Sequence, residues 1–321
     1  MKLNTLCVAV CTAMLTAGAV HAQAYPERPV RLIVPYAPGG SADIAARMIS
    51  DGWAKELGSP LVIENRAGAG GNIGVDAVAK SAPDGYTIGL QTVSLAINPA
   101  LFASMPYDTL KDLAPIGMIA SSQHVLAVNP KVDVSNLKDL IQKAKAEPGK
   151  MSYGSAGVGS TFHMSAELFK SVADVNILHV PYRGGGPALV DTMGGQVDMS
   201  FPVISAAQQH VAGGKLNALA VTGDKRSPLL PDVPTAQEAG LPGYVFDTWF
   251  MVFAPDGTPQ PVIDKLNSSL NATLNSESIK ARLMKEGFEP TPTTPVEAKT
   301  KLETDMPKWA KLIQERGITA D

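Results

Sequence analysis

Apolar and polar residues follow one another along this chain in short blocks that predict strands, each followed by a helix. Residues 30–36 (VRLIVPY) form a compact apolar block that is typical of a buried strand. After a Pro-Gly-Gly break, residues 44–57 place apolar side chains at helical spacing, and Ser41 or Asp43 is expected to cap that helix. The repeated strand–helix order predicts an α/β fold with mostly parallel strands covered on both faces.

The same rhythm restarts near Ser122, which indicates two α/β lobes. We expect one lobe from residues 25–124 and 247–321, and a second lobe, inserted in the first, from residues 125–246. The pattern predicts further strands at 61–64, 86–91, 124–128, 151–154, 175–180, 197–201, 216–222 and 248–254. It predicts further helices at 75–80, 137–146, 162–172 and 261–274, one that follows the glycines at 184–186 and runs into Met193, and one through Trp309 to Arg316.

The first 24 residues differ from the rest. Lys2 precedes an apolar run over 6–20, and Ala22 and Ala24 then offer small residues for a signal peptidase. This order predicts a cleaved signal peptide over residues 1–24 and export of the mature chain. A membrane anchor is the alternative, but the run is short and no second apolar span of about 20 residues follows.

Cysteine and charge exclude several classes of function. Both cysteines, Cys7 and Cys11, lie inside the predicted signal, so a mature chain has no disulfide, cysteine nucleophile or cysteine-bound zinc. The 27 basic and 30 acidic residues form no basic stripe, which argues against a nucleic-acid partner. The five histidines show no metal-ligand spacing, and we expect neither a metal nor a cofactor.

Two loops bear the candidate chemistry. APGGSAD (37–43) follows the first strand, and SAGVGST (155–161) follows the strand at 151–154; each precedes a helix. Open α/β sheets bind ligands at such strand-to-helix junctions, where unpaired N–H groups favour an anion and glycine permits close approach. Turn and cap chemistry explains either loop alone. Two of them, one in each lobe of an exported chain, favour an anion-binding cleft.

Seven segments, in order from about residue 25 to residue 260, resemble the serial motifs of the substrate-binding receptors of tripartite tricarboxylate transporters, often called Bug receptors. They are PVRLIVPYAPGGSADIAAR, VIENRAGAGGNIGVDAVAKSAPDGYT, INPALF with PYDTLKDLAPIG, SYGSAGVGSTFH, HVPYRGGGPAL with GGQVDM, LAVTGDKRSPLLPDVPTAQEAGLPGY, and FAPDGTP.

The resemblance implies a type II periplasmic binding-protein fold, in which two α/β lobes joined by a hinge close on a ligand in the cleft. It implies a periplasmic receptor, not an enzyme, that captures organic acids such as di- and tricarboxylates, aromatic acids or acidic amino acids. Delivery would go to a membrane permease with one large and one small subunit. We expect the receptor to be a monomer.

The resemblance also implies which residues hold the ligand carboxylate, through backbone N–H groups, hydroxyls and ordered water. They are Tyr36, Ala37, Gly39, Gly40, Ser41 and Asp43 in the first loop, and Ser155, Gly157, Gly159, Ser160, Thr161 and His163 in the second.

One residue departs from the family pattern. Many members have an aromatic residue followed by Asp after GGQVDM, whereas here Pro202 follows Phe201. Proline removes both a charge and an N–H donor. We therefore expect Pro202 to make the distal pocket less acidic, which would favour a second carboxylate or an aromatic ring over an amine.

Three other interpretations remain open. The glycine-rich segment 67–74 is similar to a dinucleotide loop, but its spacing is Gly-x-Gly-x-x-x-Gly and it follows the second strand, so a structural turn is favoured. A hydrolase is not excluded by composition, although Tyr153 precludes a Gly-x-Ser-x-Gly elbow around Ser155. A receptor that signals to a membrane sensor would use the same closed form as a transport receptor.

Overall fold

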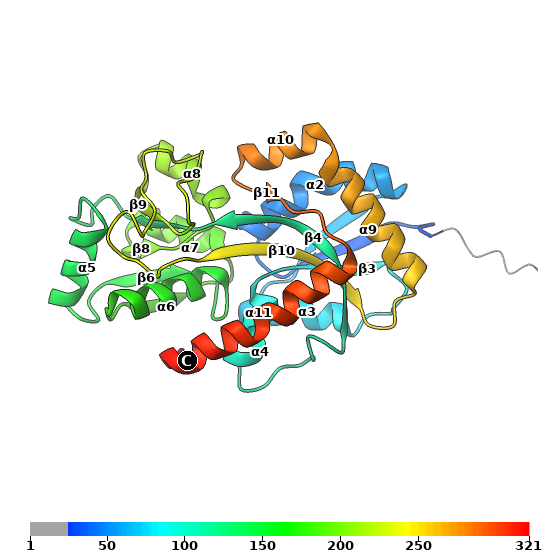
Figure 1. Ribbon diagram of the computed structural model, residues 1–321, viewed down its shortest axis with the longest axis horizontal. Helices are drawn as coiled ribbons and strands as arrows, with labels where there is room; N and C mark the ends of the chain where they lie inside the picture. Colours follow the sequence, from blue (N-terminus) through cyan, green and yellow to red (C-terminus); the bar gives the residue numbers. More distant parts are fainter. Residues whose placement is uncertain (1–24, 321) are drawn as a thin grey trace, which may run out of the picture.

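Two β-sheets, each covered by helices, lie side by side along the long axis of the molecule (Figure 1). The structure is a computed structural model that describes residues 25–320, and of Arg316 only the backbone. The signal peptide predicted over residues 1–24 lies outside the described residues.

The first sheet mixes parallel and antiparallel strands. Its order is β11 (Glu289–Pro290), β4 (Leu113–Gln123), β10 (Asp247–Pro255), β3 (Thr87–Thr92), β1 (Val30–Val34) and β2 (Leu61–Asn65). β1 pairs in parallel with β2 and β3. β10 runs antiparallel to β3 and β4, and β11 runs antiparallel to β4.

The second sheet is also mixed. Its order is β7 (Leu178–Pro181), β6 (Ser152–Ser155), β8 (Met199–Ser200), β5 (Val125–Val128) and β9 (Asn217–Val221). β6 is parallel to β7 and β8, whereas β5 is antiparallel to β8 and β9. The prediction of mostly parallel sheets is therefore wrong. β10 brings the chain back into the first sheet and β5 brings it into the second. Each of these two strands runs opposite to both of its neighbours.

Helices cover the sheets and hold them through buried contacts. They are α2 (Ser41–Leu57), α3 (Asn72–Ala79), α4 (Ser94–Leu101), α5 (Leu137–Ala146), α6 (Thr161–Ala173), α7 (Gly185–Gly194), α8 (Ile204–Ala212), α9 (Gln260–Asn275), α10 (Glu277–Lys285) and α11 (Pro295–Arg316). Trp53 of α2 is fully buried, and its Nε1 donates a hydrogen bond to Ser269 Oγ of α9 over 2.9 Å. The indole thus adds both apolar burial and a satisfied polar group to the core.

The chain crosses between the sheets where β4 continues into β5 and again just before β10. His124 is the single residue between β4 and β5. Its backbone N–H donates to Thr222 Oγ1 over 2.8 Å, and its carbonyl accepts the N–H of Thr222 over 3.0 Å. The Thr222 hydroxyl also donates to the carbonyl of Phe246, so both crossing segments are tied together at this point.

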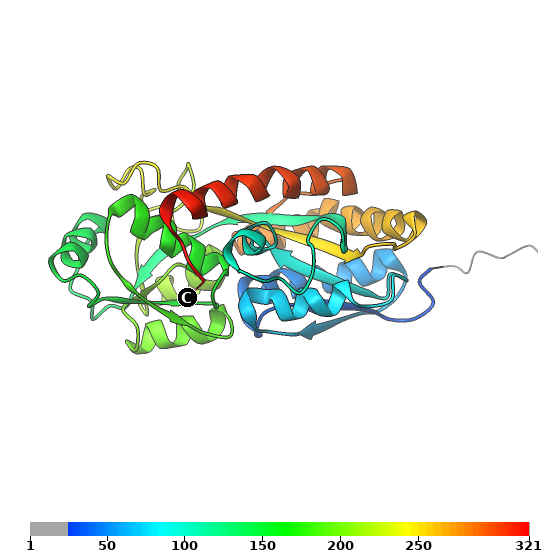
Figure 2. The same ribbon diagram turned by 90° about the horizontal axis from the view of Figure 1, so that it is seen from below.

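α11 extends over both sheets. Figures 1 and 2 show that it begins beside β4 and β10 and ends beside α6. Trp249 Nε1 of β10 donates to Asp305 Oδ2 in the middle of α11 over 2.7 Å, and the ring of Trp309 lies 5.3 Å from that of Phe246. All strands of the first sheet come from residues 30–123 and 247–290, and those of the second from 125–221. On this basis we propose the lobe boundaries given above. We also propose that α11 packs against both lobes.

Candidate functional site

The loop after β1 enters α2 without a side-chain cap. The N-cap residue is Gly40, and no side chain accepts a hydrogen bond from the first N–H groups of the helix. The predicted cap by Ser41 or Asp43 is therefore wrong, because Ser41 is the first helical residue and Asp43 the third. Uncapped N–H groups and the positive end of the helix dipole favour an anion here.

The Asp43 side chain holds this loop in place by hydrogen bonds. Its carboxylate accepts hydrogen bonds from the N–H of Gly39, from Asn65 Nδ2 and from Arg47 Nε, each over 3.0 Å. Burial raises the pKa of the Asp43 carboxyl, but the hydrogen bonds from Arg47, Gly39 and Asn65 together hold it below its ordinary value. The carboxylate therefore stays charged and its oxygens are occupied within the loop.

Tyr36 lies two residues after the end of β1 and is buried. Its hydroxyl lies within hydrogen-bonding distance of Ser94 Oγ (3.2 Å) and the carbonyl of Gly70 (3.3 Å). Burial raises the pKa of the Tyr36 hydroxyl, so it remains protonated and can donate a hydrogen bond.

The loop after β6 is held by its own polar groups. Ser160 is the N-cap of α6, and its Oγ accepts the N–H of His163 over 3.3 Å. His163 Nδ1 accepts the N–H of Gly159 over 3.2 Å. Ser155 Oγ accepts the N–H of Gly157 over 3.1 Å and lies 2.6 Å from His179 Nε2.

Two neutral histidines support this second loop. The rings of His163 and His179 stack with centroids 4.4 Å apart. Burial lowers the pKa of His163 to about 4, and burial together with the neighbouring His163 lowers that of His179 to about 3. Ser155 is fully buried and its Oγ is already engaged. The Ser155–His179 pair therefore positions the loop and gives a substrate no exposed nucleophile.

A third helix N-terminus joins these two loops. α7 begins at Gly185 after the N-cap Gly184, again without a side-chain cap. A Cβ at position 184 would lie 2.8 Å from the Cβ of Ala37, so the close approach of the two lobes requires glycine there. In the sequence, the glycines at 184–186 are the feature that could have pointed to a third helix N-terminus at the site.

One cavity brings the three helix ends together. Its volume is about 10 Å³, room for about one water molecule. It is lined by Tyr36, Gly40, Ser41, Ala42, Thr92, Ala156, Ser160, Thr161, Phe162 and Gly185. No charged side chain is among these lining residues. The site thus offers main-chain N–H groups and hydroxyls from both lobes and no cation.

Five of the predicted site residues line this cavity: Tyr36, Gly40, Ser41, Ser160 and Thr161. The other predicted residues lie outside the lining: Ala37, Gly39, Asp43, Ser155, Gly157, Gly159, His163 and Pro202. Asp43, Ser155 and His163 hold the loops by the hydrogen bonds given above. Pro202 is buried between β8 and α8, where its carbonyl accepts the N–H of Val125 over 2.8 Å. Its effect on selectivity remains a prediction.

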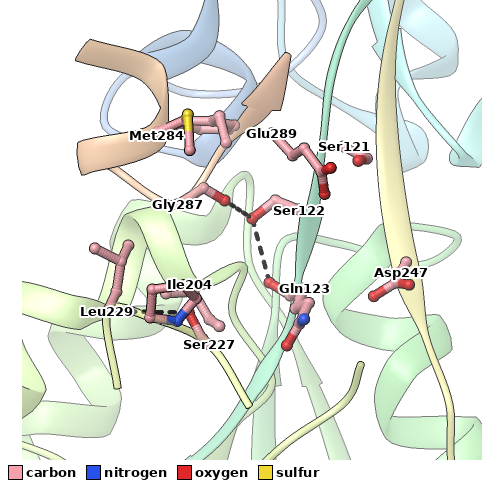
Figure 3. Close-up of a pocket in the computed structure, with 12 residues that line it drawn as sticks. Ser121, Ser122, Gln123, Ile204, Ser227, Leu229, Asp247, Met284, Gly287 and Glu289 are labelled. Atoms are coloured by element: carbon pink, nitrogen blue, oxygen red, sulfur yellow. Dashed lines mark hydrogen bonds between the residues drawn. The ribbon is translucent and has the colours of Figure 1, made fainter. Parts of the chain in front are cut away.

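A larger pocket, of about 350 Å³, lies at the crossing strands (Figure 3). Glu289 lies beside Ser121 and Asp247 beside Gln123 in this pocket, while Ile204 and Leu229 form the facing wall. Neither carboxylate has a cationic partner within 4.0 Å in the described part of the chain. Two unpaired carboxylates disfavour an acidic ligand, so the smaller cavity is the better candidate for an anion.

Two kinds of feature are absent from residues 25–320. Within this range, no helix combines the length and apolar character needed to span a bilayer. The same residues hold no cluster of three or more His, Cys, Asp or Glu side chains placed to bind a metal ion.

Known proteins are similar to this chain in sequence and architecture. The family model described as tripartite tricarboxylate transporter family receptor matches residues 45–318. The chain is 39% identical to protein BugT of Bordetella pertussis over 99% of each chain. It is similar to the solved structures of an R. palustris protein with adipate (37% identity, TM-score 0.89, 92% of this chain and 99% of that one) and of MatC from Rhodopseudomonas palustris with bound malate (32%, 0.87, 90% and 100%).

These likenesses confirm the predicted fold class, two α/β lobes of the periplasmic binding-protein type. The chain belongs to the receptor family of the tripartite tricarboxylate transporters.

Proposed function

We propose that this receptor captures a small organic acid between its two lobes in the periplasm and delivers it to a tripartite tricarboxylate-type permease. The observation that supports this most is the convergence of three helix N-termini, those of α2, α6 and α7, on one cavity that is lined by no charged side chain of the described residues. The adipate and malate held by two relatives are ligands of the class that such a site favours.

The chemistry of the site suits a carboxylate. Each helix end presents N–H groups and about half a positive charge, and three such ends favour an anion without an ion pair. Within the described residues, the hydroxyls of Ser41 and Thr161 have no hydrogen-bond partner, so both are free to donate to a ligand. A neutral, donor-rich cavity is also consistent with reversible capture, because no buried charge is stranded when the ligand leaves.

Capture requires the lobes to move. A cavity of about 10 Å³ has room for about one water molecule, so the lobes of this closed arrangement must part before an acid can enter. We infer that the lobes part at the crossing segments near His124 and Phe246, admit the acid to one lobe, and close when the other lobe adds its N–H donors. The ligand then shifts an existing open–closed equilibrium by the contacts that only the closed form makes.

The proposal is tested by a thermal-shift panel of di-, tri- and aromatic carboxylates on the mature protein, followed by calorimetry on each acid that raises the melting temperature. At least one acid should bind with 1:1 stoichiometry, while the corresponding amide should not. If no acid in the panel binds, or if the neutral amides bind equally well, an anion site at the helix ends is wrong.

A further inference from the structure

A second space between the lobes adjoins the cavity. Its volume is about 380 Å³, and it shares Ala156 with the cavity lining. The first lobe contributes residues 68–70, Phe102 and Ala320, and the second contributes residues 156–158 and 181–183. Ala156 thus lies between the helix N-termini and this outer pocket, which is where the far end of a longer ligand would reach.

The outer pocket combines apolar walls with one cation. Phe102, Val158 and Pro181 provide apolar surface, and no carboxylate is among the described residues that line the space. Tyr182 also lines it, but its hydroxyl donates to Asp191 Oδ2 over 2.7 Å and is thus occupied. Arg183 is the charged residue of the lining.

Arg183 is free for an anion. Within residues 25–320, its guanidinium makes no ion pair and no hydrogen bond, and its side chain is exposed. Arg28, Arg47 and Arg226, by contrast, are each paired with a carboxylate. The carbonyl of Arg183 accepts the N–H of Ala37 over 3.4 Å, so the closed arrangement fixes the Arg183 backbone beside the first loop.

We propose that Arg183 binds the second carboxylate of a dicarboxylic acid whose first carboxylate lies at the helix N-termini. This inference rests on the proposed function and narrows the ligand class to diacids with an apolar spacer, which the walls of the outer pocket accommodate. A planar guanidinium can hold a carboxylate through two parallel hydrogen bonds, which gives selectivity for a charged end over a methyl end.

The test compares matched acids by calorimetry on the mature protein: succinate with butyrate, glutarate with pentanoate, and adipate with hexanoate. The wild type should bind at least one diacid more tightly than its partner monoacid. Arg183→Met should weaken that diacid about tenfold and change the monoacid less than twofold. Arg183→Lys should recover part of the loss. Lys145→Met, which removes an equal charge from the exposed end of α5, should leave both affinities unchanged.

The outcomes separate this inference from the proposed function. Binding of diacids that is unaffected by Arg183→Met, or an equal loss for diacid and monoacid, would overturn the role of Arg183 and leave the helix-end site intact. A wild type that prefers the monoacids would also overturn it. Failure of every acid to bind the wild type would contradict both.

Discussion

The N–H of Ala37 donates a hydrogen bond to the carbonyl of Arg183, 3.4 Å away in the other lobe. Ala37 precedes α2 and Arg183 precedes α7, so this contact brings two helix N-termini from different lobes to one cavity. A donor from a third helix, α6, completes the lining. The closed form is thus defined by backbone groups, and small changes at these positions should alter closure more than folding.

Gly184→Ala should impede closure. The new Cβ would lie 2.8 Å from Ala37 Cβ and 3.0 Å from Ala37 N, across the lobe interface. We expect weaker acid binding and a larger radius of gyration by small-angle X-ray scattering in saturating acid, with a melting temperature close to wild type. Gly194→Ala is the matched control, because a Cβ there meets nothing within 4 Å. A Gly184→Ala protein that closes and binds normally would show that this contact does not define the closed form.

The hydroxyls that line the cavity should contribute directly to affinity. Ser41→Ala and Thr161→Val each remove a hydroxyl without an internal partner, and each should cost about 1.5–3 kcal/mol of binding free energy, or at least tenfold in Kd. Ser268→Ala on the exposed face of α9 serves as control. Calorimetry with the tightest acid measures all three. Equal affinities for all three variants would remove these hydroxyls from the site.

Asp43→Asn should destabilise the protein in a pH-dependent manner. The folded pKa of Asp43 is lowered, so its charge stabilises the fold above the ordinary carboxyl pKa of about 4, and this contribution disappears as the pH falls through the lower folded value. Urea unfolding should show a difference between wild type and Asp43→Asn at pH 7 that narrows toward pH 3. A difference that is constant with pH would show that the hydrogen-bonding shape of the side chain, not its charge, matters.

Acid should destabilise the loop after β6. The pKa values of His163 and His179, about 4 and about 3, lie below the ordinary value of about 6.5, so between these values the unfolded chain binds protons that the folded chain does not. Stability should therefore fall as the pH drops from about 6.5 to about 4. His163→Gln should reduce the slope of unfolding free energy against pH by up to one proton, or about 1.4 kcal/mol per pH unit. An unchanged slope would show that His163 titrates normally.

Local pattern predicted local structure well and long-range geometry poorly. The apolar block at 30–36 and the helical spacing at 44–57 correspond to β1 and α2, and the range 137–146 coincides with α5. β4 was not predicted, because Pro115 and Gly117 interrupt its apolar pattern, although it is the longest strand in the described residues and leads into the crossing. Its antiparallel pairing with β10 also made the expectation of mostly parallel sheets wrong.

In the candidate site, too, the sequence predicted the local loops but not how the fold brings them together. The strand-to-helix loops at 37–43 and 155–161 were recognisable because glycine and hydroxyl residues stand between a strand and a helix. The glycines at 184–186 also stand between a strand and a helix, but the sequence assigns them no ligand, since only the fold brings α7 beside α2. A ligand contact for Asp43 and His163 stays a prediction. In the structure, both residues hold the loops that line the cavity by hydrogen bonds.

The most direct test of the account is a crystal structure of the mature protein with the acid that binds most tightly. One carboxylate should lie within hydrogen-bonding distance of N–H groups or hydroxyls at the starts of α2, α6 and α7, with no cationic side chain in contact with that carboxylate. An acid bound instead in the pocket beside Asp247 and Glu289, or held at one lobe alone in the closed form, would contradict it.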